Sequence, residues 1–342
     1  MKRDRTQRRL DQLRAIRHAP SSPGAPEILA EVLGENSNDA AARAAAIVEE
    51  AQLFDLAPRL VDAFHRFMED APKLDRGCEA VTAIAKALYA LDHHHYEVYR
   101  KGARHRQLEG GFGTPTDAAQ ALRGVCAMGL SQIRRPDVLD ELVLMLTDDS
   151  AAVRASAARA VGCAATSEIA VPLLKLKLYC GDDEADVLAE CMTSMLSSSF
   201  SRCLDVVMRQ LDDSSPKRSE AAAIALGSMR DDRVFDALHA KWQNTASVGL
   251  RRRILQALSM SRTEKGLNFL YEAAAKETPS TALAAAKALL IHRHDPRIFG
   301  KLQELAGERK EIAQLLAESG SVEAGSVEAG SVEDSGATFG VD

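Results

Sequence analysis

The stretch PDVLDELVLMLTDDSAAVRASAARAVGCAA, residues 136–165, decides the fold of this 342-residue chain. Its first half carries an apolar stripe at i, i+3, i+4 and i+7, which is the spacing of one helix face. The stripe consists of Leu139, Leu142, Val143 and Leu146. An acidic turn, Asp148-Asp149-Ser150, then caps a second helix with an apolar face, and Gly162 stops that helix. The stretch therefore predicts a hairpin of two helices.

The same outline returns along the chain in units that begin near residues 168, 201, 232 and 263. Paired aspartates mark three of the turns, and Asp149, Asp183 and Asp213 are 34 and 30 residues apart. This period fits a two-helix hairpin, whereas a leucine-rich repeat is shorter and a propeller blade is longer and rich in strand. Upstream, residues 25–51, 55–91 and 96–130 each predict a further helix pair. We therefore expect eight hairpins and a final single helix near Asp295.

One pattern in these repeats points to a known family. The run from Asp148-Asp149 to Val153-Arg154, an acidic turn followed by Val-Arg, an Ala-rich helix and Gly, resembles the bacterial HEAT repeats of the phycobilisome-lyase type. The resemblance is close over residues 117–316 and looser over 25–116, and it implies an all-α solenoid of HEAT-like helical hairpins, an α-α superhelix. Leu follows Val at Val187-Leu188, where the pattern has Arg, so we expect any ladder of Asp and Arg side chains to be interrupted there.

Composition agrees with such a fold. Hydrophobic residues make up 46% of the chain but aromatic residues only 4%, which favours closely packed helices over sheets. No stretch approaches the roughly 20 apolar residues of a membrane span, and the basic amino terminus lacks the apolar run of a signal peptide. We therefore expect a cytoplasmic protein with no membrane partner.

The cysteines give no sign of a metal or redox site. They stand singly in apolar helical stretches with no Cys-x-x-Cys pair, so we expect reduced core residues. They are Cys78, Cys126, Cys163, Cys180, Cys191 and Cys203.

Charge gathers at the two ends. Residues 1–17 hold seven Lys or Arg against two Asp, and residues 317–342 hold six acids and no base. We expect a basic arm or capping helix over 1–24, the solenoid over 25–317 with an inserted loop at about 92–116, and a disordered acidic tail of GSVEA repeats over 318–342. The tail buries too little to offset an ordering cost of about 1–2 kcal/mol per residue, although it can fold back transiently on the basic arm. The body between the ends is acidic, so no nucleic acid is expected as a partner.

The segment from His93 to Pro115 is the densest polar cluster. Its three adjacent histidines point about 100° apart on a helix and no acid pair completes a ligand set, so we expect no bound metal. Its basic residues, beside a glycine-rich loop, predict a face that binds an anion or a partner protein, and the alternative is a long connection with a solvated surface. The basic residues are Arg100, Lys101, Arg104, His105 and Arg106.

Some enzymes are built on similar repeats, so we compare their catalytic motifs with this sequence. Deoxyhypusine hydroxylase takes its iron ligands from His-Glu pairs, and none of the nine histidines here precedes Glu. A HEAT-like DNA glycosylase needs a basic, aromatic-lined face, which this acidic chain with a single Trp does not offer. Phycobilisome lyases share the repeat residues, but those residues specify packing and not chemistry. No catalytic residue, cofactor or metal is therefore expected.

The function that follows is a non-catalytic protein-binding scaffold or adaptor that uses the concave surface made by the second helices of its hairpins. The alternative is an enzyme of the lyase type or another small-anion-binding HEAT protein. The predicted partner-binding residues are basic members of the second helices and of the inserted segment. They are Arg100, Arg104, Arg106, Arg123, Arg154, Arg159, Lys217, Arg218, Arg251 and Arg252.

Overall fold

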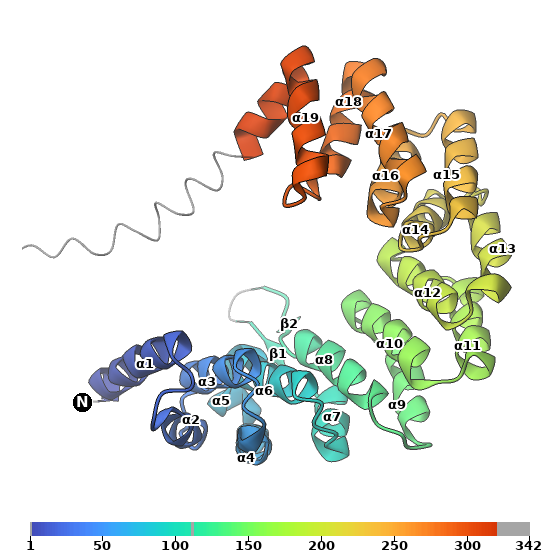
Figure 1. Cartoon of the computed structure of the whole chain (residues 1–342). Coiled ribbons are helices and arrows are strands. Elements are labelled where there is room, and N and C mark those ends of the chain that lie inside the picture. Colours follow the sequence, from blue (N-terminus) through green and yellow to red (C-terminus); the bar gives the residue numbers. More distant parts are fainter. Residues whose placement is uncertain (1, 111–112, 320–342) are drawn as a thin grey trace, which may run out of the picture. The chain divides into compact units, whose positions relative to one another are not determined.

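The computed structural model describes residues 2–110 and 113–319, in which the regular elements are helices apart from one short β-hairpin (Figure 1). The chain divides into two compact units, one up to Leu204 and one from Asp205 onward. Both units consist of successive helix pairs, so the expected all-α solenoid of helical hairpins is confirmed. Within the described residues, no helix is long and apolar enough to cross a membrane.

The first unit begins with a long helix, α1 (Lys2–His18), and continues with paired helices. Short helical turns η1 (Phe54–Leu56), α5 (Ala71–Leu74) and η2 (Arg76–Cys78) flank the helix α4 (Ala57–Phe67). The pairs are α2 (Ala25–Leu33) with α3 (Asn38–Glu50), α4 (Ala57–Phe67) with α6 (Glu79–Ala90), α7 (Tyr96–Ala103) with α8 (Gln120–Ser131), α9 (Val138–Met145) with α10 (Ala151–Ala164), and α11 (Ser167–Cys180) with α12 (Ala185–Ser198).

The second helices of these pairs pack side by side, and we call them the second-helix layer of the first unit. In this layer α3 packs on α6, α6 on α8, α8 on α10 and α10 on α12, while α1 packs on α3 and so extends the layer by one helix. Figure 1 shows α3, α6, α8 and α10 in one row, with α2, α4, α7 and α9 in the other. Several buried faces in this layer are rich in Ala, as in α10, where Ala157, Ala158 and Ala160 are fully buried.

Small residues let the second helices approach one another closely. A Cβ on Gly162 of α10 would lie 2.9 Å from the Cβ of Ser194 on α12, and one on Gly124 of α8 would lie 3.0 Å from the Oγ of Ser156 on α10. Both distances are shorter than ordinary van der Waals contact between carbon atoms. The Gly and Ala content read from the sequence therefore sets the spacing of this layer.

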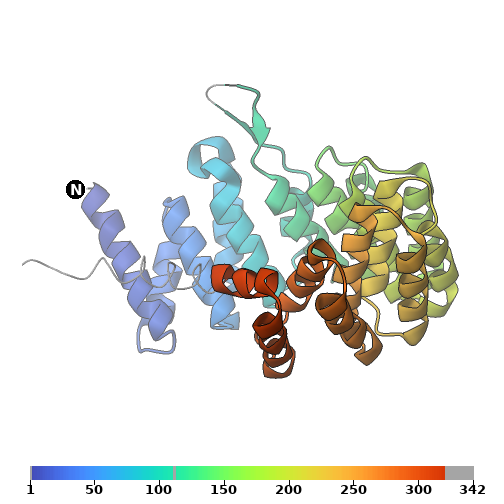
Figure 2. The same ribbon diagram turned by 90° about the horizontal axis from the view of Figure 1, so that it is seen from above.

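A small insertion interrupts the third pair. After α7 the chain forms β1 (Leu108–Glu109) and β2 (Thr116–Asp117), an antiparallel hairpin in which Leu108 faces Asp117. Figure 2 shows this hairpin projecting away from the helices of the first unit. The segment expected as an inserted loop from residue 92 thus contains a regular helix, α7, before the hairpin.

The second unit repeats the same design. Helix α13 (Phe200–Gln210) spans the unit boundary and precedes α14 (Pro216–Gly227). Two more pairs follow, α15 (Asp232–Asn244) with α16 (Val248–Ser261), and α17 (Glu264–Lys276) with α18 (Pro279–Leu290). Helix α14 packs on α16 and α16 on α18, and Trp242 of α15 is buried in the core.

The carboxyl-terminal end differs from the sequence prediction. Helix α19 (Pro296–Glu308) was expected to stand alone, but residues 310–319 form another helix after it. Ile312 is fully buried in that helix, which provides the apolar contact that a final single helix would lack. The helix also includes two residues of the expected tail, Glu318 and Ser319. The rest of the tail lies outside the described residues, so its disorder stays a prediction.

Candidate functional site

A repeated aspartate holds the start of each second helix from the third pair to the sixth. We call these residues the turn aspartates, and each accepts a hydrogen bond from the backbone N–H two residues later, at 2.8–3.0 Å. They are Asp117, Asp148, Asp182 and Asp213. The turn aspartates are 31, 34 and 31 residues apart. The sequence analysis counted the period from Asp149 and Asp183, but the residues that accept these hydrogen bonds are their neighbours Asp148 and Asp182.

An arginine six residues after a turn aspartate reaches forward to the next repeat. Arg123, six after Asp117, donates to both carboxylate oxygens of Asp148 at 3.0 Å. Arg154, six after Asp148, donates to both oxygens of Asp182 at 2.8 and 2.7 Å. The next two equivalent positions hold Leu188 and Ser219. The Asp and Arg ladder therefore stops at the departure that the sequence predicted.

Two carboxylates of this ladder, Asp117 and Asp182, remain charged because their partners outweigh their burial. Burial acts to raise the pKa of Asp117, but hydrogen bonds from the Ala119 N–H and Arg123 hold that pKa below its usual value. Burial also acts to raise the pKa of Asp182. Hydrogen bonds from Arg154 and Lys177 outweigh this effect and hold the pKa of Asp182 well below its usual value. Both groups are fully ionised near neutral pH, as a packing role requires.

Arginines of the inserted segment stay partly exposed but pair with buried acids. Arg100 and Arg104 both donate to the carboxylate of Glu141 on α9, which is only 8% exposed. Arg106 pairs with Asp148 at 2.5 Å. These three arginines, expected to contact a ligand, therefore tie the α7 hairpin to the α9 hairpin.

The other predicted partner-binding residues fall into two groups. Arg123 is buried and Arg154 nearly so, and Arg251 donates to the carbonyl of Thr245 at 2.9 Å while its guanidinium lies over the Trp242 ring. Arg218 lies 4.0 Å from Asp213. The second group stays exposed, and consists of Arg159, Lys217 and Arg252. Within this group, Arg159 is 60% exposed and pairs with Glu190, whose side chain is only 14% exposed.

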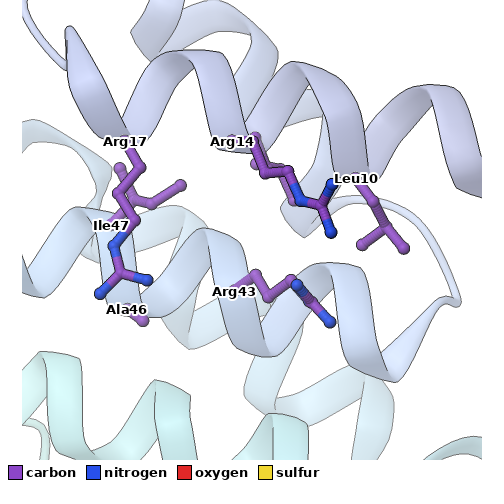
Figure 3. Close-up of a pocket in the computed structure, with 7 residues that line it drawn as sticks. Leu10, Arg14, Arg17, Arg43, Ala46 and Ile47 are labelled. Carbon is purple, nitrogen blue, oxygen red and sulfur yellow. The ribbon is translucent and has the colours of Figure 1, made fainter. Parts of the chain in front are cut away.

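A pocket between α1 and α3 gathers three further arginines that the sequence analysis did not single out. It has a volume of about 90 Å³, with an aliphatic floor and a basic rim. In Figure 3, Leu10, Arg14 and Arg17 on α1 and Arg43, Ala46 and Ile47 on α3 lie on either side of the gap. The lining consists of Leu10, Leu13, Arg14, Arg17, Arg43, Ala46 and Ile47.

The charge of this α1–α3 pocket is only partly balanced. Arg17 pairs with Glu50 at 2.7 Å and Arg43 with Asp39 at 2.8 Å, and all four of these side chains are about half exposed. Arg14 is exposed and has no hydrogen-bonding or ionic partner among the residues that the structure describes. Exposed pairs contribute about 0–1 kcal/mol each, so an incoming carboxylate can replace either acid at little cost.

The sequence did contain a signal for this pocket. The basic amino-terminal segment was assigned to an arm or a capping helix, and in α1 two arginines three residues apart share a face with Leu10 and Leu13. That spacing places side chains on one side of a helix. The sequence could not show that Arg43 belongs to this pocket, because Arg43 lies on α3, the second helix of the hairpin that follows α1.

A second, wider depression of about 650 Å³ lies at one end of the hairpins. Its lining includes Asp92, His94, Arg134, Cys163 and Thr166. His94 Nε2 lies 2.9 Å from an Asp92 carboxylate oxygen. No three His, Cys, Asp or Glu side chains within residues 2–110 and 113–319 are arranged to hold a metal ion.

The cysteine prediction needs one correction. Cys78, Cys126, Cys191 and Cys203 are buried free thiols, and burial raises the pKa of Cys78 and of Cys191 to about 12. Cys163 and Cys180 are exposed, because each sits at the last turn of its helix on the side that no neighbouring helix covers. These two are therefore surface thiols and not core residues.

Comparison with known proteins supports the repeat assignment. A family model described as HEAT repeats matches residues 204–291, which cover most of α13 and all of α14 to α18. No match was found among curated proteins. Together with the paired helices of both units, the match shows a HEAT-like repeat protein.

Two solved structures that match this chain have low sequence identity and low TM-scores to it. One is the complex of CpcE and CpcF of phycocyanin lyase from Nostoc sp. PCC7120, at 17% identity and a TM-score of 0.33, covering 66% of this chain and 88% of that chain. Another is an engineered protein, at 18% identity and a TM-score of 0.32, covering 89% of this chain and 92% of that chain.

Proposed function

We propose that this HEAT-like repeat protein is a non-catalytic scaffold that binds another protein along the second-helix layer of its first unit, with the α1–α3 pocket as the anchor. The observation that carries the proposal is the combination of Arg14, Arg17 and Arg43 with an aliphatic floor. Guanidinium groups bind carboxylates through paired hydrogen bonds, and the floor accepts a small apolar side chain. The pocket therefore suits an acidic peptide segment in which an aliphatic residue adjoins Asp or Glu.

The rest of the second-helix layer offers complementary but weaker contacts. Arg159 of α10 is 60% exposed and pairs with Glu190, and Lys86 of α6 pairs with Glu49 at 3.3 Å. Charges of both signs on such a surface favour orientation and specificity more than affinity. Arg159 thus remains a proposed contact, together with Lys217 and Arg252 in the second unit. The arginines of the ladder and of the inserted segment are not part of the proposed contact surface.

The test compares capture of partner proteins by matched variants. Tagged wild-type protein, an Arg14→Ala/Arg43→Ala variant and an Arg135→Ala/Arg233→Ala variant are each incubated with native lysate, and bound proteins are quantified by mass spectrometry. The last variant removes the same charge from two exposed arginines that pair with Asp137 and Asp231, the residues just before the first helices of their hairpins.

The proposal predicts that one or more proteins retained by the wild type and by the Arg135/Arg233 variant are depleted at least tenfold with the Arg14/Arg43 variant. Equal capture by all three variants would remove the pocket from the binding surface. A wild type that retains no protein above a tag-only control would overturn the scaffold function itself.

A further inference from the structure

We infer that the α1–α3 pocket binds the carboxyl terminus of the partner protein, with a small aliphatic last residue on the pocket floor and the terminal α-carboxylate between Arg14 and Arg43. The inference rests on the proposed function and specifies which carboxylate the pocket receives. Both helices that line the pocket belong to the first unit. The partner is then a protein whose last residues extend away from its own fold.

The three arginines of the pocket are divided between its two ends. In Figure 3 the guanidinium groups of Arg14 and Arg43 lie towards one end, on opposite sides of the gap between α1 and α3, and that of Arg17 lies towards the other. Within the described residues, the lining contains no acid. Arg14 is exposed, and Arg43 pairs with Asp39 of its own helix in a half-exposed contact. One carboxylate can therefore accept hydrogen bonds from both sides of the gap.

The pocket floor has room for a small aliphatic side chain. It consists of Leu10, Leu13, Ala46 and Ile47, and the pocket volume is about 90 Å³. An apolar cavity of about 150 Å³ holds a benzene ring, so this pocket is too small to enclose an aromatic side chain. A Val side chain fits, and it contributes affinity in proportion to the apolar area that is removed from water.

Side-chain geometry favours a chain terminus over an internal acidic segment. Consecutive side chains point to opposite faces of an extended peptide, and they point about 100° apart on a helix. An aliphatic residue and the Asp or Glu next to it therefore do not both point into one small opening. In a carboxyl-terminal residue, the side chain and the α-carboxylate leave the same Cα atom. One group can then reach the floor while the other meets the two guanidinium groups.

Arg17 extends recognition to a residue before the terminus. Alternate residues of an extended peptide share a face and lie about 7 Å apart. An Asp or Glu two positions before the last residue therefore faces the same side as that residue, towards the end where Arg17 lies. Arg17 pairs with Glu50, but the two side chains are 63% and 49% exposed, so an incoming carboxylate can replace Glu50 at little cost.

The experiment uses peptides labelled with fluorescein at the amino terminus. The terminal peptide is Gly-Ser-Gly-Ser-Glu-Ser-Val with a free α-carboxylate. The internal peptide, Gly-Ser-Gly-Ser-Glu-Glu-Val with an amidated end, has the same net charge and places Glu beside Val. The Ser-ended peptide, Gly-Ser-Gly-Ser-Glu-Ser-Ser with a free α-carboxylate, keeps the charge and lacks the aliphatic side chain. Fluorescence anisotropy is measured with the full-length wild type, Arg14→Ala/Arg43→Ala, and Arg135→Ala/Arg233→Ala as the charge-matched control.

We expect the terminal peptide to bind at least tenfold more tightly than the internal peptide and at least fivefold more tightly than the Ser-ended peptide. Arg14→Ala/Arg43→Ala should weaken its binding at least tenfold, and the control should change it less than twofold. A second variant, Ala46→Glu, keeps all three arginines and places a competing carboxylate in the pocket, so it should also weaken binding at least tenfold. Melting temperatures of all variants should match that of the wild type, because Arg14 and Arg43 are exposed and Ala46 is half-buried.

Four results would overturn the inference: no binding of the terminal peptide at millimolar protein, equal or tighter binding of the internal peptide, equal binding of the Ser-ended peptide, or binding that ignores the loss of Arg14 and Arg43. These outcomes are separable from failure of the proposed function. If lysate capture depends on the two arginines but the internal peptide binds as well as the terminal one, only the inference fails. If the terminal peptide binds through the arginines but lysate capture ignores them, only the proposed function fails.

Discussion

The guanidinium of Arg123 donates to both carboxylate oxygens of Asp148 at 3.0 Å, and each of the two side chains is only 1% exposed. The remaining Nη1 donates to the His105 carbonyl at 3.1 Å and to Asp117 at 2.5 Å. Charges withdrawn this far from water persist only when nearly every donor and acceptor has a partner. The pair joins helix α8 to the turn of the next hairpin, so it serves repeat packing.

Replacing Arg123 by Met should destabilise the first unit strongly. The change leaves Asp148 and Asp117 buried without their main partner, which lowers the free energy of unfolding by about 3–5 kcal/mol. We expect a value near about 3 kcal/mol, because Arg106 still pairs with Asp148. Urea unfolding followed by circular dichroism measures the loss. Arg159→Met, which breaks the exposed pair with Glu190, is the control and should cost less than about 1 kcal/mol. Equal losses in the two variants would mean that the buried pair is not structural.

Replacing Arg100, Arg104 and Arg106 together by Ala should lower the melting temperature. If these arginines were only exposed ligand contacts, their removal would leave the melting temperature unchanged. However, the buried carboxylates of Glu141 and Asp148 pair with them. An unsatisfied buried carboxylate costs about 1–3 kcal/mol. Adding Glu141→Gln to the triple variant should recover part of the loss, because the uncompensated charge is gone. An unchanged melting temperature would return these arginines to the list of surface contacts.

Two glycines in the second unit should respond to Ala in opposite directions. A Cβ on Gly227 of α14 would lie 2.5 Å from the Cα of Ala257 on α16, so Gly227→Ala forces the helices apart and should destabilise by about 1–3 kcal/mol. A Cβ on Gly300 of α19 meets nothing within 4 Å. Gly300→Ala should therefore stabilise its helix by about 0.5–1 kcal/mol. Chemical denaturation of both variants checks the sign, and a neutral Gly227→Ala would contradict the close packing of α14 on α16.

Acidification should destabilise the region around His65 and His93. Burial, followed by the charges of Lys101 and His95, lowers the pKa of His65, against opposing attraction from Asp62 and Glu97. Burial and then His95 and His94 lower the pKa of His93. Because both folded-state pKa values lie below the unfolded value of about 6.5, the stabilisation is complete above pH 6.5 and is lost as pH falls through that value.

The measurement is the melting temperature at pH 7.5 and pH 5.5. The turn aspartates Asp117 and Asp182 stay ionised in this range because their pKa values are lowered, so they do not mask the effect. A His65→Gln/His93→Gln variant should lose less stability than the wild type between the two pH values. The same loss in both proteins would assign the pH dependence to other groups.

The hairpin repeat could be predicted from sequence because each unit carries its own local signals. The stripe from Leu139 to Leu146 and the acidic turn are both read within 30 residues. Two details of that reading were wrong: α10 continues past Gly162 to Ala164, and Val143 of the stripe is 39% exposed. The single-helix prediction at the carboxyl end failed because residues 310–319 lack the acidic turn that marks other second helices. Ile312 shows that the helix is nevertheless packed.

The roles of individual arginines could not be predicted in the same way. Arg123 and Arg159 are both basic residues on second helices, yet one is buried and the other exposed. The distinguishing signal is position relative to the turn aspartate: Arg123 and Arg154 both stand six residues after one, and Arg159 does not. The α1–α3 pocket needed the structure, because its three arginines come from two helices that are not partners in one hairpin.

The most direct test of the central claim is to locate the partner on the surface of the first unit. A photo-activatable amino acid replaces Ala46, which lines the α1–α3 pocket and is half-buried. In a second protein it replaces Leu144, which is 63% exposed on the first helix α9. Both proteins are irradiated in native lysate and their covalent adducts are identified by mass spectrometry. The account predicts a protein adduct from position 46 that is absent from position 144 and is lost with Arg14→Ala/Arg43→Ala. Adducts from position 144 with none from position 46 would contradict it.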